Sequence, residues 1–188
     1  GDILGAMDQG RNQFAKEAGG RESRRPAVSA VCADGTLIEL LYDAYERTTA
    51  FAVWREGGWT IEKDVTLAAS ERLIPFSPEN NLIRNEAVLL PAKPEEYGSE
   101  AELLTEVQDF IHRYVDLSPT FEKAASYYVL FSWVHDSFNE VPYLRLRGDF
   151  GTGKTRGLIA IGSLCYKAFF ASGASTVSPI FHTLDAFR

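Results

Sequence analysis

Hydrophobic and polar residues alternate over the first half of the chain in short runs of strand length. Four such runs are rich in β-branched and aromatic residues: 28–32, 36–42, 48–54 and 59–65. Asp34-Gly35 joins the first two runs and Glu56-Gly57-Gly58 joins the second two, and glycine at such positions favours a tight hairpin turn. Weaker strand candidates follow at 72–76 and 87–90. We therefore expect a small antiparallel β-rich domain over residues 27–91.

The period of the pattern changes to that of a helix after a linker marked by Pro91 and Pro94. Ser99 and Glu102 have the spacing of a capping box, which marks the start of a helix. Apolar residues then recur on one helical face: Leu103, Val107, Phe110, Ile111 and Tyr114. The pattern predicts an amphipathic helix that ends near Asp116.

A second helix is predicted to start at Ser118-Pro119, because proline is favoured in the first turn of a helix. Residues 124–134 are apolar on almost every side, which is typical of a helix buried between layers. We interpret residues 92–140 as a helical linker module that joins the β-rich domain to the rest of the chain.

The last part of the chain, residues 141–188, returns to alternating strand-like and helical patterns. Tyr143 to Arg147 is a short β-like run, although its two arginines make it less apolar than a central parallel strand. Either the arginine heads reach water at the sheet edge, or they contact nucleic acid or a neighbouring subunit. Helical spacing follows at Leu158, Ile161 and Cys165. Two further elements are expected: a strand over Ala168–Ser172, and a helix from Ser175 or Thr176 through Phe187.

Between the β-like run and the helix lies the pattern G-x-x-x-x-G-K-T. It consists of Gly148, Asp149, Phe150, Gly151, Thr152, Gly153, Lys154 and Thr155. This is the spacing of the phosphate-binding P-loop, and strand, loop and helix form the context that the motif requires. The competing interpretation is a glycine-rich turn with a chance lysine. The motif predicts that the chain binds ATP, or another nucleoside triphosphate, together with Mg²⁺.

Each part of the motif has a chemical reason. Successive backbone N–H groups in a curled loop donate to phosphate oxygens, and glycines permit positive φ and leave no Cβ in the way. The following helix adds the partial positive charge of its N-terminus. Lys154 is expected to act as the catalytic cation at the β- and γ-phosphates, and the hydroxyl of Thr155 is expected to bind Mg²⁺. Arg156 completes the predicted nucleotide-binding set.

Composition limits the classes of partner. The 188-residue chain is 45% hydrophobic and 12% aromatic, which supports a folded core rather than wholesale disorder. Its net charge of −7 and pI of about 5.0 argue against a large basic nucleic-acid surface but leave room for a local patch. Trp54 and Trp59 flank a hairpin turn, where they either pack across the strands or stack on bases.

Reactive side chains form no second motif. Cys32 and Cys165 are interpreted as reduced, buried thiols of a cytoplasmic protein. The histidines, His112, His135 and His182, have no metal-ligand spacing and are interpreted as surface or packing residues. No apolar run approaches the ~20 residues of a membrane span, so no membrane partner is expected.

The first 26 residues are predicted to be a tag remnant and a flexible lead-in. Gly5-Ala6-Met7 is typical of a tag scar, and residues 8–26 are polar. No apolar stretch at the start has the character of a signal peptide. Arg24 and Arg25 are interpreted as part of a solvated tail, with contact to nucleic acid as the alternative.

The loop is similar to the G-x-x-G-T-G-K-T loop of AAA+ ATPases. The stretch from about Gly35 to Arg188 resembles the helicase-type ATPases of phages, plasmids and mobile elements, including primase-helicase proteins. The likeness lies in the layout, in which a β-rich domain ending in Leu89-Leu90-Pro91 precedes the helical pair, Val141–Arg147 and the loop. Residues 171–176, followed by Pro179-Ile180-Phe181, are also similar to the second strand and helix of these ATPases.

The resemblance implies ATP hydrolysis coupled to movement on DNA by a ring of identical subunits. It also implies an acidic Walker B strand, sensor residues and an arginine finger; none is assigned here, and the Walker B strand is expected just past Arg188. We therefore expect a full-length parent that is an ATPase and a 188-residue chain that is inactive alone. The expected fold class is α+β: a β-rich domain, a helical pair and the incomplete first half of an α/β P-loop NTPase core over residues 141–188.

The resemblance has a consequence for folding. The first two strands of such a core are not neighbours, so a fragment that contains only those two leaves open sheet edges. We expect Tyr143–Tyr166 to be loose, rearranged or paired with another copy of the chain.

Two other functions compete with the helicase-type ATPase. One is a non-enzymatic module that binds DNA or a protein partner and carries a vestigial P-loop. The other is a P-loop kinase or nucleotide transferase, which the T-G-K-T form after a helical module makes less favoured.

Overall fold

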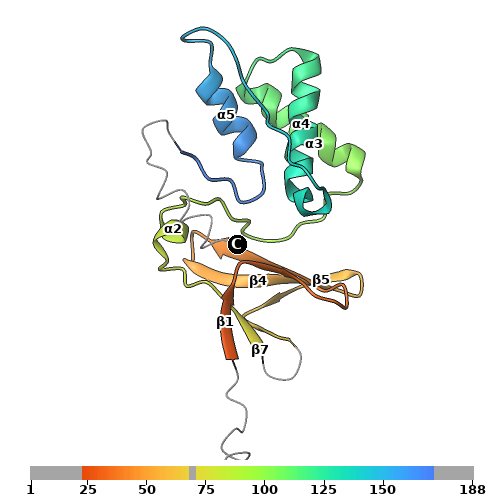
Figure 1. Cartoon of the computed structure of the whole chain (residues 1–188), viewed down its shortest axis with the longest axis vertical. Coiled ribbons are helices and arrows are strands. Elements are labelled where there is room, and N and C mark those ends of the chain that lie inside the picture. Colours follow the sequence, from red (N-terminus) through yellow and green to blue (C-terminus); the bar gives the residue numbers. More distant parts are fainter. Residues whose placement is uncertain (1–22, 68–70, 172–188) are drawn as a thin grey trace, which may run out of the picture. The chain divides into compact units, whose positions relative to one another are not determined.

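The computed structural model describes residues 23–67 and 71–171. These ranges contain seven strands in two sheets and four α-helices, so the predicted mixed α+β class is confirmed (Figure 1). The chain forms two compact units. One unit combines the described residues up to Leu40 with Ala50–Phe76, and the other combines Leu41–Thr49 with the described residues from Ser77 onward. The division into domains at residues 26, 91 and 140 stays a prediction.

The four-stranded sheet contains both predicted hairpins. Its strands lie in the order β2 (Ser29–Val31), β3 (Leu37–Asp43), β4 (Thr48–Arg55) and β5 (Gly58–Glu62). β2 pairs antiparallel with β3, and β4 pairs antiparallel with β5. Gly35 turns the first hairpin at φ 85°, and Glu56 and Gly57 turn the second at 51° and 84°. Both turns thus use the left-handed backbone that the glycines predicted.

Both faces of this sheet are buried at its centre, and one of them also carries a tryptophan pair. The most buried positions are 2% exposed or less, namely Ile38, Leu40, Phe51 and Val53, and the neighbouring Leu41 and Ala52 are 4% and 3% exposed. Trp54 follows Val53 and therefore points to the opposite face, where it lies across from Trp59. The two ring centroids are 5.2 Å apart, which is cross-strand packing, one of the two alternatives given for this pair in the sequence analysis.

The three-stranded sheet corrects two expectations. β1 (Ser23–Ala27) pairs parallel with β7 (Glu71–Pro75), and β7 pairs antiparallel with β6 (Val65–Thr66). The β-rich region is therefore not a simple antiparallel meander. Ser23–Pro26 is not part of a flexible lead-in, because the parallel partner and an ion pair between Arg25 and Glu71 (Nε–Oε1 2.8 Å) hold it in a strand. The rest of the predicted lead-in lies outside the described residues.

The segment after β7 contains a short helix that the sequence pattern did not indicate. α2 (Asn81–Arg84) is capped by Asn80, whose side chain accepts from the N–H of Leu82 (2.9 Å). The weak strand candidate at 87–90 forms only an isolated bridge between Val88 and Phe169. The described part of the predicted strand Ala168–Ser172 is therefore this bridge and not a strand of a parallel core. The predicted helix through Phe187 lies outside the described residues.

Three helices form the core of the second unit: α3 (Glu100–Tyr114), α4 (Pro119–Trp133) and α5 (Lys154–Gly162). A short 3₁₀ turn, η1 (His135–Ser137), follows α4. The buried cluster between the helices contains Val107, Ile111, Ala125, Val129 and Ile161. α3 starts at a capping box formed by Ser99 and Glu102, as predicted. None of the helices described is long and apolar enough to cross a membrane.

α4 starts at the predicted proline but is not buried between layers. Its fully buried face consists of Ala125, Ser126 and Val129, whereas Tyr127 and Trp133 are 51% and 45% exposed. The expectation was wrong because a helix can be apolar on every side and still have packing partners on only some of its sides. In the described unit, α3 and α5 are the helices packed most closely against α4.

The β-like run Tyr143–Arg147 does not form a strand. A strand needs a neighbour for its N–H and C=O groups, and the described residues offer none beside this run. Leu144 instead packs against the helical cluster. The described residues therefore show a helix after the P-loop motif but no strand before it.

Candidate phosphate-binding loop

The 148–155 loop is a compact turn whose shape depends on glycine. Gly151 and Gly153 have φ of 82° and 78°, a conformation that costs glycine little. At Gly148, an added Cβ would lie only 2.7 Å from Oγ1 of Thr152. The carbonyl of Asp149 accepts from the hydroxyl of Thr152 (2.9 Å) and from its N–H (3.4 Å). The start of the loop is thus folded against its middle.

Lys154 lies across this turn. Its Nζ donates to the carbonyl oxygen of Gly148 (2.8 Å) and to that of Asp149, and it lies 3.3 Å from Oγ1 of Thr152. An ammonium group has three N–H donors, so these three acceptors use the whole donor set. An anion that enters the loop must therefore replace at least one of them.

α5 starts inside the loop, with Gly153 as its N-cap. The N–H of Gly157 donates to the carbonyl of Gly153 (2.9 Å) and begins the helical ladder. The N–H groups of the first turn precede that ladder and carry the partial positive charge of the helix start. Thr155 and Arg156 are both exposed in this turn. The arrangement places N–H groups, an ammonium and a hydroxyl within one loop and one turn.

α5 is held against the rest of the unit near both of its ends. Near its start, an added Cβ at Gly157 would lie 3.1 Å from Cδ1 of Leu146, so the chain before the loop lies close against the helix. Just past its end, the indole Nε1 of Trp133 donates to the carbonyl of Leu164 (2.9 Å). These contacts fix the helix whose first turn carries the candidate site.

The loop belongs to a locally basic stretch of an acidic chain. Residues 145–156 carry four basic side chains and one acidic one, namely Arg145, Arg147, Lys154, Arg156 and Asp149, whereas the whole chain has a net charge of −7. Arg145 and Arg147 are exposed. A local excess of positive charge attracts anions even on an acidic protein.

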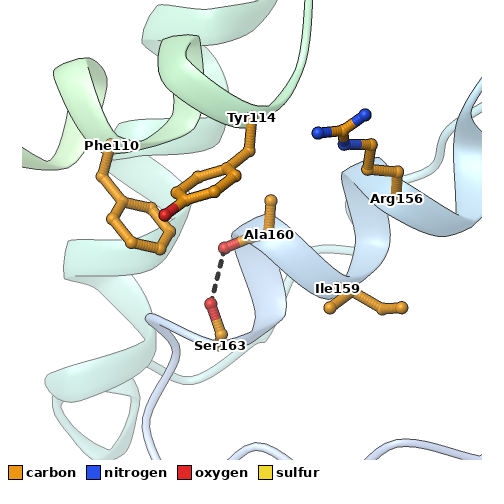
Figure 2. Close-up of a pocket in the computed structure, with 6 residues that line it drawn as sticks. All are labelled: Phe110, Tyr114, Arg156, Ile159, Ala160 and Ser163. Carbon is orange, nitrogen blue, oxygen red and sulfur yellow. Dashed lines mark hydrogen bonds between the residues drawn. The ribbon is translucent and has the colours of Figure 1, made fainter.

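A shallow pocket of about 280 Å³ lies between α3 and α5, and its lining includes Arg156, the residue that follows the loop (Figure 2). α3 contributes Phe110 and Tyr114, and α5 contributes Arg156 together with Ile159, Ala160 and Ser163. Sequence reasoning placed Arg156 in the site but assigned both aromatic residues to helix packing. The available signal was their spacing of four residues, which puts two aromatic rings side by side on one helix face.

The cysteines and histidines of the described residues make local contacts of their own. No group of three or more His, Cys, Asp or Glu side chains suited to a metal occurs in the described part of the chain. Cys32 and Cys165 are half-buried free thiols, and burial raises the pKa of the Cys165 thiol. His112 contacts Glu122, and His135 Nδ1 lies 3.0 Å from the carbonyl of Ser132. His182 lies outside the described residues.

All eight residues of the predicted motif lie in the single loop and helix start just described, together with Arg156. Comparison with protein-family models, with curated proteins and with solved structures finds no match to this chain.

Proposed function

We propose that the 148–155 loop binds the phosphate groups of a nucleoside triphosphate, with ATP and Mg²⁺ as the ligand pair. The observation that carries the proposal is Lys154, whose ammonium closes a glycine loop at the start of α5 by bonding the carbonyl oxygens of Gly148 and Asp149. A chance glycine-rich turn gives no reason for Gly151 and Gly153 both to have positive φ. It also gives no reason for all the donors of one lysine to bond to the turn.

The donors present suit a triphosphate. Phosphate oxygens accept from the first-turn N–H groups of α5 and from Nζ of Lys154, which exchanges one carbonyl partner for a phosphate oxygen. The absence of a side chain at Gly148 lets the loop stay folded against Thr152 while it does so. The binding energy comes from charge-assisted hydrogen bonds formed by groups that are already gathered in one loop.

The donors also suit Mg²⁺ in the form that nucleotides carry. Mg²⁺ prefers oxygen ligands, keeps several waters and is commonly held by substrate phosphates with few protein ligands. The exposed hydroxyl of Thr155 supplies one such oxygen at the helix start. When bound, Mg²⁺ neutralises charge on the phosphates. No cluster of acidic ligands is needed for this mode of binding.

We further propose that this chain binds nucleotide without efficient hydrolysis. Phosphoryl transfer requires a residue that orients the attacking water, and no described residue around the loop can be assigned that role. The helicase-type ATPase, acting on DNA as a homo-oligomer, remains our proposal for the function that this chain serves, and its support is the motif and layout of the sequence. A partial P-loop NTPase core over residues 141–188 belongs to the same proposal.

The test is a binding titration with Mg-ATP on three proteins: the unaltered chain, Lys154→Ala and Lys123→Ala. Lys123 is an exposed lysine on α4, so its removal controls for the loss of one positive charge in the same unit. We expect Mg-ATP at 100 times its Kd to raise the free energy of unfolding by about 2.7 kcal/mol in the unaltered chain and in Lys123→Ala, and much less in Lys154→Ala. Equal responses from all three proteins would contradict the proposal.

A binding module with a vestigial loop is the second candidate, and the tryptophan pair favours it. Trp59 is 42% exposed beside Trp54, and exposed aromatic rings can stack on single-stranded bases. This candidate predicts that a DNA oligonucleotide quenches tryptophan fluorescence, that Trp59→Ala removes the quenching, and that Mg-ATP does not bind. Nucleotide binding that depends on Lys154 would rule out a vestigial loop.

A further inference from the structure

We propose that the pocket between α3 and α5 takes the planar base of the nucleotide whose phosphates bind the 148–155 loop. This inference rests on the proposed phosphate-binding function and adds the class of ligand to it. The preferred ligand is then a triphosphate that carries an aromatic base, rather than a polyphosphate as such.

The walls of the pocket suit a flat aromatic group. Phe110 and Tyr114 lie with ring centroids 4.9 Å apart at an interplanar angle of 53°. Figure 2 shows the Phe110 and Tyr114 rings beside each other on the α3 side of the pocket and the Arg156 side chain extending from α5 toward α3. An aromatic face and a guanidinium plane are the two surfaces on which bases stack in proteins.

The position of the pocket suits a ligand whose phosphates are at the loop. Arg156 directly follows Thr155 and lies in the first turn of α5, so one side chain adjoins both the loop and the pocket. The remaining α5 walls, Ile159 to Ser163, lie farther along the same helix. At a rise of 1.5 Å per residue, Ser163 lies about 10 Å beyond Arg156. That distance is about the length of a nucleoside. A nucleotide whose phosphates lie at the loop can therefore reach the pocket with its base.

The size of the pocket suits a base rather than a whole nucleotide. Its volume of about 280 Å³ is slightly below the range, ~300–1,000 Å³, that is usual for small-molecule sites. Tyr114 is 42% exposed, so its ring offers a face that a base can cover. The oxygen of Ser163, whose hydroxyl donates to the carbonyl of Ala160 (2.9 Å), can still accept a hydrogen bond at the edge of the site.

The experiment compares two ligands that share their phosphates and differ in the base: Mg-ATP and Mg-tripolyphosphate. Each is titrated into the unaltered chain, Tyr114→Leu, Tyr114→Ala and Tyr127→Ala, and binding is measured by calorimetry. Tyr114→Leu keeps apolar volume on α3 and removes only the aromatic plane, and helical circular dichroism reports whether each variant folds. Tyr127, an exposed tyrosine on α4, provides the matched control.

We expect the unaltered chain and Tyr127→Ala to bind Mg-ATP about tenfold or more tightly than Mg-tripolyphosphate, as stacking on one aromatic side chain allows. In Tyr114→Leu and Tyr114→Ala the affinity for Mg-ATP should fall to that for Mg-tripolyphosphate, whose own affinity should not change. Equal affinity of the unaltered chain for both ligands would overturn the base site and leave the phosphate site standing. Failure of both ligands to bind would overturn the phosphate site as well.

Discussion

Gly148 shows how one residue sets the shape of the 148–155 loop. An added Cβ there would lie 2.7 Å from Oγ1 of Thr152, whereas an added Cβ at Gly58, in a hairpin of the other unit, would meet no atom within 4 Å. The added Cβ would displace the threonine hydroxyl from the position in which it donates to the carbonyl of Asp149. One of the hydrogen bonds that shape the loop would then be disturbed.

We therefore predict that Gly148→Ala lowers the free energy of unfolding by roughly 1 kcal/mol and weakens Mg-ATP binding, while Gly58→Ala leaves nucleotide binding unchanged. Urea unfolding and a nucleotide titration measure the two effects. Unchanged nucleotide affinity in Gly148→Ala would show that the close approach of Gly148 to Thr152 is not required for binding.

His112 provides a residue-scale prediction with a defined pH dependence. Its Nδ1 lies 2.9 Å from Oε2 of Glu122, and the pair links the end of α3 to the start of α4. The hydrogen bond and the negative charge of Glu122 raise the pKa of His112. A group with a raised pKa in the folded state stabilises the fold fully below its unfolded pKa, about 6.5, and loses that contribution as the pH rises through the folded value.

The expected result is that His112→Gln destabilises the fold more at pH 5.5 than at pH 9. Glu122→Gln should show the same dependence, because it removes the partner of the same proton. The measurement is the free energy of unfolding in urea at the two pH values. A larger effect of either substitution at pH 9 would have the wrong sign for this pair.

At the scale of elements, the serines at the starts of α3 and α4 differ in whether their side chains cap the helix. Ser99 accepts from the N–H of Glu102 (3.3 Å), and the Glu102 carboxylate accepts from the N–H of Ser99 (2.8 Å). Ser118 occupies the same position before α4 but makes no capping hydrogen bond through its side chain. The two serines therefore form a matched pair.

Ser99→Ala should lower the free energy of unfolding by about 1 kcal/mol, the usual value for a lost N-cap, and Ser118→Ala should change it much less. Chemical denaturation of both variants gives the comparison. Equal losses at the two positions would mean that the hydrogen bonds of the capping box do not stabilise α3.

Elements with local signals could be predicted from the sequence. Both hairpins were found because Gly35 and Gly57 mark the turns between neighbouring strands, and α3 was found because its cap and apolar face lie within fifteen residues. Such signals need no knowledge of distant partners. The predicted elements that failed were those whose existence depends on a partner far along the chain.

β1 and the run Tyr143–Arg147 illustrate that limit in opposite directions. β1 is polar and exposed and showed no alternation, yet it is a strand because Glu71–Pro75 pairs with it. Tyr143–Arg147 alternates as a strand does, yet the described residues provide no neighbouring strand. The candidate site divides in the same way. The loop could be predicted from its spacing, whereas the pocket lined by Phe110, Tyr114 and Arg156 exists only because α3 packs on α5.

At the scale of the whole molecule, a local excess of basic residues and the glycines with positive φ occur in the same segment of the chain. A chain with a net charge of −7 gathers four basic residues around the 148–155 loop, and the loop stands at the start of a helix that is packed against α3 and α4. The helical unit thus provides a fixed support, and the loop provides the polar groups that a triphosphate requires. The central claim is that these groups bind phosphate through Lys154.

The most direct test of that claim is backbone amide exchange at residues 149–156, measured with and without saturating Mg-ATP in the unaltered chain and in Lys154→Ala. If the loop N–H groups donate to phosphate oxygens, their exchange slows when nucleotide is added to the unaltered chain and does not slow in Lys154→Ala. Amide exchange in the unaltered chain that is the same with and without Mg-ATP would contradict phosphate binding by this loop.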